Sequence, residues 1–396
     1  MELEGRDPIV RKAVARFEAA SAAKRRGRTG AAATSLRKMI SLAGKVDGPD
    51  RLSLESVALH QLADVAGGDL LATEIERALE LAALTEQGGP AGWTVRFALG
   101  DAFRRRDPRA AMAWYDAANL MRRSALTYSA DRMDQLAERL IKVFDRSTVA
   151  RLSRSGSPSE KPVFIVGLPR SGTTLVERIL AGLPGVEAGG ELRAMPEVCR
   201  QIHGLKGGWP EAASNLTSDQ IAHLGAGYLR TLEGVASAAR RVTDKMPANI
   251  QNIGLILGMF PGATIIHVRR DPLDACFGCY RQLFGGNVDY AYDQTELARY
   301  WRAIDRLARH WSELAPDQYV EVEYETLASD PEAESRHLAE AIGVTWTEDC
   351  LNVARRSGVI DTASALQARQ PISSRNIGAS EPFLPYLGEL RRALSV

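Results

Sequence analysis

The sequence predicts an α/β fold, a parallel sheet covered by helices, preceded by an all-helical region. Three observations lead to this expectation. Up to about residue 150 the chain shows repeated hydrophobic patterns with a period of 3.6 residues and few β-branched runs. After residue 160, short apolar runs alternate with amphipathic segments, which is typical of a parallel sheet with helices on both faces. With 396 residues, the chain exceeds a comfortable single core, so two domains are expected.

The first predicted domain, residues 1–152, is all-helical and tetratricopeptide-like. Its helices are expected at 8–25, 30–44, 53–66, 70–85, 92–105, 109–123 and 129–145. The pair around Gly100 and Tyr115 fits the tetratricopeptide pattern if one residue is deleted from its turn, and an earlier pair matches more weakly. These helices could bind a protein partner or present a substrate. They could also simply cover the second domain, which is favoured because helix pairs commonly exist for packing alone.

A linker rich in Ser, Gly and Pro is predicted at 153–160, and the second domain is predicted at 161–396. Its strands are expected at 163–167, 241–243, 263–268 and 319–323. Its helices are expected at 173–183, 192–203, 217–239, 247–258, 272–284, 295–315, 331–342 and 347–356. Because ligands bind at the carboxyl ends of parallel strands, the functional residues are expected just after each strand.

The composition excludes several classes of function. Hydrophobic residues make up 45% and charged residues 25% of the chain, as in soluble globular proteins. The net charge is only +1, which gives no support for a nucleic-acid or membrane partner. No apolar run approaches the ~20 residues that span a bilayer, and the first seven residues do not form a secretory signal. Four cysteines in so long a chain form no disulfide framework, so a cytoplasmic protein is expected.

The most informative segment is the apolar run 163–167 with the tight turn and helix that follow it. Such a turn directs backbone N–H groups and a helix N-terminus at one point, where they can bind phosphate. The spacing from Gly167 to Gly172, followed by two threonines, is that of a nucleotide-binding P-loop. Thr173 stands where ATP or GTP enzymes have the lysine that reaches the β- and γ-phosphates. This difference argues against a P-loop kinase or NTPase and for a ligand phosphorylated in another way.

The loop resembles the 5′-phosphosulfate loop of sulfotransferases, which use 3′-phosphoadenosine 5′-phosphosulfate (PAPS). The residues that carry this resemblance are Pro169, Arg170, Ser171, Gly172, Thr173 and Thr174. More narrowly, residues 160–390 resemble bacterial sulfotransferases with tetratricopeptide-like helices, which are related to the tyrosylprotein sulfotransferases. The resemblance implies the sulfotransferase fold, PAPS as co-substrate, and a hydroxyl-bearing acceptor such as a peptide tyrosine, a carbohydrate or a small molecule.

Sulfuryl transfer needs a base for the acceptor's proton and positive charge where the phosphate departs. The resemblance implies that Glu191 is the base, that Arg193 helps to hold the site, and that Lys245 contacts the bridging oxygen and the sulfate. Arg170 is expected to stabilise the phosphosulfate as well. From residue types alone, Glu191 could instead be a helix N-terminal glutamate, and Lys245 could form an exposed ion pair with Asp244.

The rest of the nucleotide site follows from the same resemblance. Arg270 aligns with the arginine that binds the 3′-phosphate, and Arg269 is a further candidate, since guanidinium matches phosphate bidentately. Tyr324 resembles a tyrosine near the nucleotide, although it could equally be a packing aromatic. Ser364 matches a serine close to the sulfate.

Two departures from the family pattern leave a third hypothesis open, a non-catalytic scaffold with a degenerate sulfotransferase domain. Gly278 replaces a serine that binds the 3′-phosphate, and Pro382 replaces a basic residue. No metal site is expected, because the six histidines lack ligand spacing. Cys276 and Cys279 lie on a predicted helix without a second cysteine pair, which favours packing over metal or redox chemistry.

Overall fold

The second half of the chain is built on a five-stranded sheet in which all strand pairs are parallel. The computed structural model describes residues 7–356, 358, 360, 362 and 364–395. The strands follow the spatial order β2 (Val186–Ala188), β3 (Arg241–Asp244), β1 (Pro162–Gly167), β4 (Thr264–Arg269) and β5 (Tyr319–Glu323). This arrangement confirms the predicted α/β fold. The first six residues, part of the segment interpreted as lacking a secretory signal, lie outside the described residues.

The central strand β1 explains why both faces of the sheet are covered. All six of its residues are buried. Phe164 and Val166 face one hydrophobic core, whereas Val163 and Ile165 face another. Alternation of side chains along a strand that is buried on both sides gives the continuous apolar run seen in the sequence. Helices therefore pack on both faces, and the carboxyl end of β1 opens directly into the P-loop.

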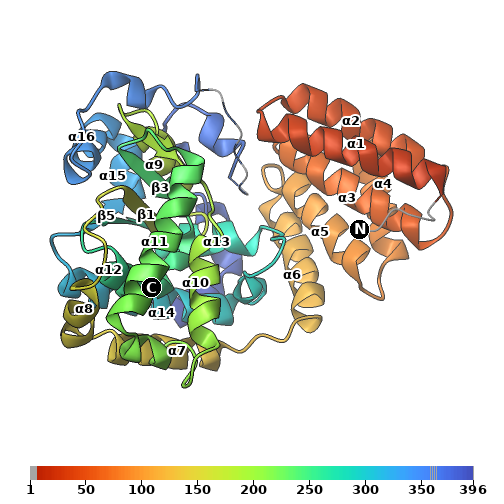
Figure 1. Ribbon diagram of the computed structural model, residues 1–396. Helices are drawn as coiled ribbons and strands as arrows, with labels where there is room; N and C mark the ends of the chain where they lie inside the picture. The colour runs from red at the N-terminus through yellow and green to blue at the C-terminus, as the bar shows by residue number, and fades with distance from the viewer. Residues whose placement is uncertain (1–6, 357, 359, 361, 363, 396) are drawn as a thin grey trace.

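The α-helices lie before, among and after the strands (Figure 1). The N-terminal ones are α1 (Pro8–Arg25), α2 (Thr29–Ala43), α3 (Pro49–Val65), α4 (Ala72–Leu84), α5 (Pro90–Phe103), α6 (Pro108–Ser124), α7 (Ala130–Val143) and α8 (Arg146–Ser153). Those among and after the strands are α9 (Thr173–Leu180), α10 (Ala194–His203), α11 (Ser218–Val235), α12 (Ile253–Met259), α13 (Pro272–Tyr280), α14 (Gln294–Leu314), α15 (Tyr324–Ser329), α16 (Pro331–Ala341) and α17 (Gly388–Leu394). No helix of the described residues is both long and apolar enough to cross a membrane.

The N-terminal helices lie beside the part that contains the sheet, while α7 and α8 run beneath that part (Figure 1). Helices α1–α5 share a hydrophobic core of their own. Phe97 of α5 and Tyr115 of α6 belong instead to the core that reaches the sheet. The side chain of Asn119 also donates to the carbonyl of Tyr280 on α13 at 2.9 Å. These contacts fit helices that cover the second half of the chain, and the boundary at 153–160 stays a prediction.

Several elements differ from the sequence expectation. Strand β2 was missed because it has three residues, two of them exposed, and so carries no apolar run. Helix α8 ends at Ser153, where the linker was expected to begin. The helix expected at 347–356 is only a 3-10 segment, Glu348–Leu351, followed by a turn at 353–355. The helix expected at 247–258 begins with a 3-10 segment, Pro247–Asn252, before α12.

Candidate functional site

The P-loop connects β1 to α9 through backbone conformations that favour glycine. Gly172 has a φ of 107°, and a Cβ there would lie 2.6 Å from Cδ2 of Tyr324. Gly167 has a φ of 148°, and its Cβ would lie 2.6 Å from the carbonyl oxygen of Val268. Helix α9 starts at Thr173 without a side-chain cap, so its first N–H groups are available to an anion.

Arginine side chains gather beside this loop. The Arg170 guanidinium donates to Oγ of Ser364 and to Oε1 of Gln367, the latter at 2.6 Å. Burial, together with the nearby charges of Arg281 and Arg270, lowers the pKa of Arg170 to about 10. The buried Nε atoms of Arg170 and Arg270 have no hydrogen-bond partner among the described residues. Crowded guanidinium groups with unsatisfied donors are well suited to an anionic ligand.

Arg270 is fixed by contacts on several sides. It donates to the carbonyl of Arg170 at 3.0 Å and forms a 3.2 Å ion pair with Asp274. Its guanidinium also stacks on the ring of Tyr324, 4.6 Å from the centroid. Tyr324 thus lies between Arg270 and Gly172. Arg270 and Tyr324 therefore belong to the same cluster as the P-loop.

Two further predicted arginines, Arg269 and Arg193, make none of the contacts that hold Arg170 and Arg270 in the described part of the chain. Arg269 forms ion pairs with Glu321 at 3.1 Å and with Asp305 at 3.4 Å. Arg193 is exposed and makes no side-chain hydrogen bond or ion pair within the part of the chain that the structure describes. Arg269 and Arg270 differ because neighbouring residues at a strand end face opposite sides of the sheet. Arg270 therefore contacts the P-loop directly, whereas Arg269 lines a small pocket with Ser171 but is paired with acidic side chains.

Glu191 and Lys245 lie next to each other at the carboxyl ends of β2 and β3. Nζ of Lys245 is 2.5 Å from Oε1 of Glu191, and the Lys245 N–H donates to the carbonyl of Gly190 at 2.9 Å. The Lys245 side chain is only 1% exposed, whereas that of Glu191 is 39% exposed. Asp244 is buried as well, so an exposed Asp244–Lys245 ion pair is not what the structure shows. The Glu191 carboxylate remains accessible to an acceptor.

Two buried carboxylates lie beside this pair: Glu177, which was not identified from the sequence, and Asp244, which was considered only as an exposed partner of Lys245. Glu177 of α9 accepts hydrogen bonds from the N–H of Gly190 and the hydroxyl of Thr243, both at 3.0 Å. Burial raises the pKa of Glu177, and the Lys245 charge opposes that rise. The other carboxylate, Asp244, accepts a 2.6 Å hydrogen bond from the hydroxyl of Tyr228. The sequence does contain a signal for Glu177, because a carboxylate stands among the apolar residues of α9. This signal was not used in the prediction of the site.

The pKa of Asp244 gives a testable pH dependence. Burial raises it to about 7 from an ordinary 3.8, although hydrogen bonds from Tyr228, Leu192 and Asn249 oppose the rise. Between these two values the unfolded chain has released a proton that the folded protein retains, so stability falls as pH rises. We expect the free energy of unfolding of the wild type minus that of Asp244→Asn to fall by about 2–3 kcal/mol between about pH 5 and pH 8.

Urea unfolding at the two pH values measures this difference. Asp317→Asn is the matched control, because Asp317 is exposed. The wild type and Asp317→Asn should show the same pH dependence. A difference between wild type and Asp244→Asn that does not change with pH would contradict the expectation.

The position of Gly278 explains one departure from the family pattern. A Cβ at Gly278 would lie 3.0 Å from Cβ of Arg170. The Arg170 side chain therefore occupies the space beside α13 into which a serine side chain would project. Pro382 is exposed in the 3-10 segment Glu381–Tyr386, next to the buried Phe383.

The cysteines on α13 behave as packing residues. Cys276 and Cys279 are buried and unpaired. Burial raises the pKa of the Cys279 thiol to about 12, and its Sγ donates to the carbonyl of Pro169 at 3.1 Å. Among the described residues, no group of three or more His, Cys, Asp or Glu side chains could hold a metal ion.

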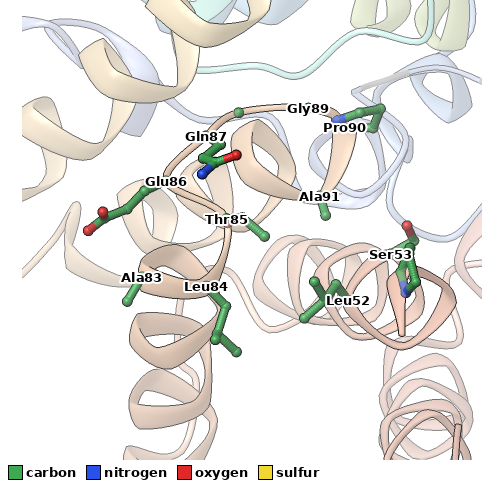
Figure 2. A pocket seen from close by; sticks show the side chains of 12 residues that line it. Leu52, Ser53, Ala83, Leu84, Thr85, Glu86, Gln87, Gly89, Pro90 and Ala91 are labelled. Carbon is green, nitrogen blue, oxygen red and sulfur yellow. The ribbon is translucent and has the colours of Figure 1, made fainter. Parts of the chain in front are cut away.

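A separate cavity of about 380 Å³ lies among the N-terminal helices (Figure 2). It is bounded by the start of α3, including Leu52, by the end of α4, including Leu84, and by the segment joining α4 to α5, including Glu86. None of the P-loop residues, nor Glu191 or Lys245, lines it. A protein partner on these helices stays a prediction.

Comparisons with known proteins show what this chain is similar to. Residues 162–348 match the model of the family described as "Sulfotransferase family". An uncharacterized protein of Aquifex aeolicus (strain VF5) is 30% identical over 294 residues, which are 72% of this chain and 39% of that protein. Protein-tyrosine sulfotransferase 2 of Gallus gallus is 24% identical over 200 residues, 48% of this chain and 53% of that protein.

The chain spans about half or less of the length of these two relatives. The solved sulfotransferase domain of the Synechococcus PCC 7002 olefin synthase is also similar, with 22% identity and a TM-score of 0.43 over 57% of this chain and 89% of that domain. At 24% identity, the relation to the protein-tyrosine sulfotransferases is distant. Residues 162–348 of this chain are thus similar to the sulfotransferase family.

Proposed function

We propose that this protein transfers a sulfuryl group from PAPS to a hydroxyl group of an acceptor. One observation carries the proposal: a P-loop without the lysine of ATP and GTP enzymes lies beside the Glu191–Lys245 pair. Strands β1 and β3 are neighbours, with Phe164 opposite Asp244, so the P-loop and Lys245 follow adjacent parallel strand ends. A phosphate cradle and a carboxylate–ammonium pair at one sheet edge provide both requirements of sulfuryl transfer.

The residues present fit PAPS at both of its charged ends. The start of α9, with Thr173 and Thr174, suits the 5′-phosphosulfate. Ser364, which accepts a hydrogen bond from Arg170, is proposed to lie at the same end of PAPS. Arg270 suits the 3′-phosphate. The unpartnered Nε atoms of Arg170 and Arg270 support this assignment, because buried donors normally have a partner. Pro169, Ser171 and Gly172 shape the cradle, whereas Arg269 and Arg193 are proposed only as outer contributors.

In the proposed reaction, Glu191 takes the proton of the acceptor hydroxyl. The acceptor oxygen then bonds to sulfur while the bond from sulfur to the bridging phosphate oxygen breaks. Lys245 stabilises the charge that builds on that bridging oxygen, and Arg170 with the loop N–H groups stabilises the other phosphosulfate oxygens. Because Lys245 and Arg170 are fixed cations in a largely buried place, they supply this stabilisation without a metal ion. The sulfated acceptor and 3′-phosphoadenosine 5′-phosphate (PAP) leave.

The broader assignment is part of the same proposal. We infer a cytoplasmic enzyme of the bacterial tetratricopeptide type, with a helical domain at 1–152 and a catalytic domain at 161–396. All four cysteines lie among the described residues and are unpaired, which fits a reducing compartment. The acceptor is proposed to be a peptide tyrosine, a carbohydrate or a small molecule with a hydroxyl group.

Ligand-dependent stabilisation tests the donor. PAP at about 100 times its Kd should raise the free energy of unfolding by about 2.7 kcal/mol, while ATP at the same concentration should not. Thermal unfolding with each ligand, followed by an assay for PAP release from PAPS with mixed hydroxyl acceptors, makes the measurement. Stabilisation by ATP alone would favour a kinase or NTPase. Stabilisation by neither ligand, without sulfate transfer, would favour a degenerate scaffold.

A second expectation separates the two neighbouring arginines. Arg270→Met should weaken PAP binding by about 10- to 150-fold, because a hydrogen bond to a charged group contributes about 1.5–3 kcal/mol. Arg269→Met should have a much smaller effect, because Arg269 is paired with Glu321 and Asp305. Titration calorimetry with PAP and with adenosine 5′-phosphate makes the comparison. The wild type should prefer PAP, and Arg270→Met should lose that preference; a retained preference would remove Arg270 from the 3′-phosphate.

A further inference from the structure

Glu177 is a buried carboxylate that the proposed chemistry does not use. It lies on α9, four residues after Thr173, and only 6% of it is exposed. A carboxylate placed among apolar side chains is unfavourable unless hydrogen bonds and a nearby cation compensate its burial. The groups that Glu177 contacts therefore indicate what its carboxylate does.

Those groups belong to the two segments that carry the reactive pair. One Glu177 oxygen, Oε1, accepts the N–H of Gly190, the residue before Glu191, at 3.0 Å. The same oxygen accepts the hydroxyl of Thr243, two residues before Lys245, also at 3.0 Å. A single carboxylate oxygen thus joins the P-loop helix to the loop of Glu191 and to strand β3.

The loop that carries Glu191 depends on such contacts because it has no regular structure. Gly190 has a φ of 68°, and Gly189 packs so closely on β3 that a Cβ would lie 2.2 Å from the carbonyl oxygen of Thr243. The N–H of Gly189 donates to the Thr243 carbonyl at 3.0 Å and approaches its hydroxyl at 3.3 Å. These bonds fix the loop to β3, and Glu177 fixes both to α9.

The charges around Glu177 fit a supporting role. The Lys245 charge favours its ionised form, while the charge of Glu191 and burial act against it. Asp244 is close enough for the Glu177 charge to raise the Asp244 pKa. Because its Oε1 already accepts two hydrogen bonds and it is buried, Glu177 is less suited than Glu191 to meet an acceptor hydroxyl.

We propose that Glu177 is a positioning residue that sets the Glu191–Lys245 pair relative to the P-loop through its hydrogen bonds to Gly190 and Thr243. The proposal rests on the proposed sulfuryl transfer for its catalytic consequence. Its geometric part, the hold on Gly190, is independent of that reaction.

Three variants test this role. Glu177→Ala removes both hydrogen bonds, Glu177→Gln keeps an amide oxygen that can accept them without the charge, and Glu233→Ala is the control on an exposed helical position. Glu177→Ala should speed hydrogen exchange at the Gly190 amide by at least about tenfold and lower kcat by about 10²-fold, while the Kd for PAP changes by less than about threefold. Glu177→Gln should restore the slow exchange and most of kcat. Glu233→Ala should match the wild type.

The outcomes that overturn the proposal are distinct. An unchanged Gly190 exchange rate or an unchanged kcat in Glu177→Ala would overturn it. So would equal impairment of Glu177→Gln and Glu177→Ala, which would assign the effect to charge alone. An equal loss of kcat and of PAP binding in a folded Glu177→Ala protein would also overturn it, because that pattern indicates a merely structural residue.

A second variant keeps the test decisive if Glu177→Ala does not fold. Thr243→Val removes one donor and preserves the β-branched shape, and it should lower kcat by about tenfold with PAP binding retained. No change in kcat for Thr243→Val would contradict the proposal. If the wild type transfers no sulfate to any acceptor, the proposed function fails, whereas hydrogen exchange at Gly190 still decides whether Glu177 holds this loop.

Discussion

Replacing Glu191 with glutamine is expected to lower kcat for sulfate transfer by about 10²–10⁴-fold, the range for loss of a positioned general base. Glutamine has nearly the same shape and can still accept the hydrogen bond from Lys245, which lies 2.5 Å from Oε1 in the wild type. It cannot take a proton from the acceptor. The KM for PAPS and the Kd for PAP should change by less than about threefold, because the expected effect lies in the chemical step.

Steady-state kinetics at saturating PAPS and calorimetry with PAP measure the two quantities separately. Glu187→Gln is the matched control, since Glu187 is an exposed glutamate on β2, four residues before Glu191. The control should retain the wild-type kcat and PAP affinity. If Glu191→Gln retained more than about a tenth of the wild-type kcat, another group would have to be the base. Loss of PAP binding in Glu191→Gln would instead place Glu191 at the nucleotide.

The parts of the fold that could be predicted from the sequence are those set by local patterns. The apolar run of β1 and the glycine spacing of the P-loop are contiguous, so they predicted the strand, the turn and the start of α9 at Thr173. The same holds for β4, which is an almost continuous apolar run, and for β5, in which valines alternate with glutamates. Strand β2 has no such run and became visible only through its pairing with β3.

The Glu191–Lys245 contact could not be predicted from spacing, because it joins two segments 54 residues apart. It depends on the sheet order, which places β2 beside β3 and β3 beside β1. The resemblance to sulfotransferases supplied both residues without their geometry. Glu177 was missed for a related reason. Its partners, Gly190 and Thr243, come from separate elements, and nothing within α9 indicates them.

The arginines proposed to bind the nucleotide could also be predicted only in part from the sequence. The alternation of side chains at a strand end could have indicated that Arg269 and Arg270 have different partners. The path of Arg170 could not have been foreseen, because it follows from a φ of 72° at that residue. The sequence presented Gly278 as a lost hydroxyl, whereas the structure shows that Arg170 packs against it.

Replacing Lys245 with methionine is expected to lower kcat by about 10²–10³-fold, the loss that follows removal of one preorganised donor from developing negative charge. Methionine keeps an unbranched side chain at a position where only 1% of the lysine side chain is exposed. The charge of Lys245 acts at short range in a largely dehydrated place, where electrostatic interactions are stronger than in water. Lys142→Met on α7 is the control, because Lys142 is exposed, and it should leave kcat unchanged.

The double variant Glu191→Gln/Lys245→Met decides whether the two residues work together. Because their side chains are hydrogen-bonded to each other, each single change disturbs the partner as well as the reaction. The loss of kcat in the double variant should therefore be smaller than the product of the two single losses. PAP affinity, measured for all three variants, separates this coupling from a general loss of the fold. Losses that multiply fully would show that the base and the cation act independently, and the 2.5 Å contact would then have no catalytic meaning.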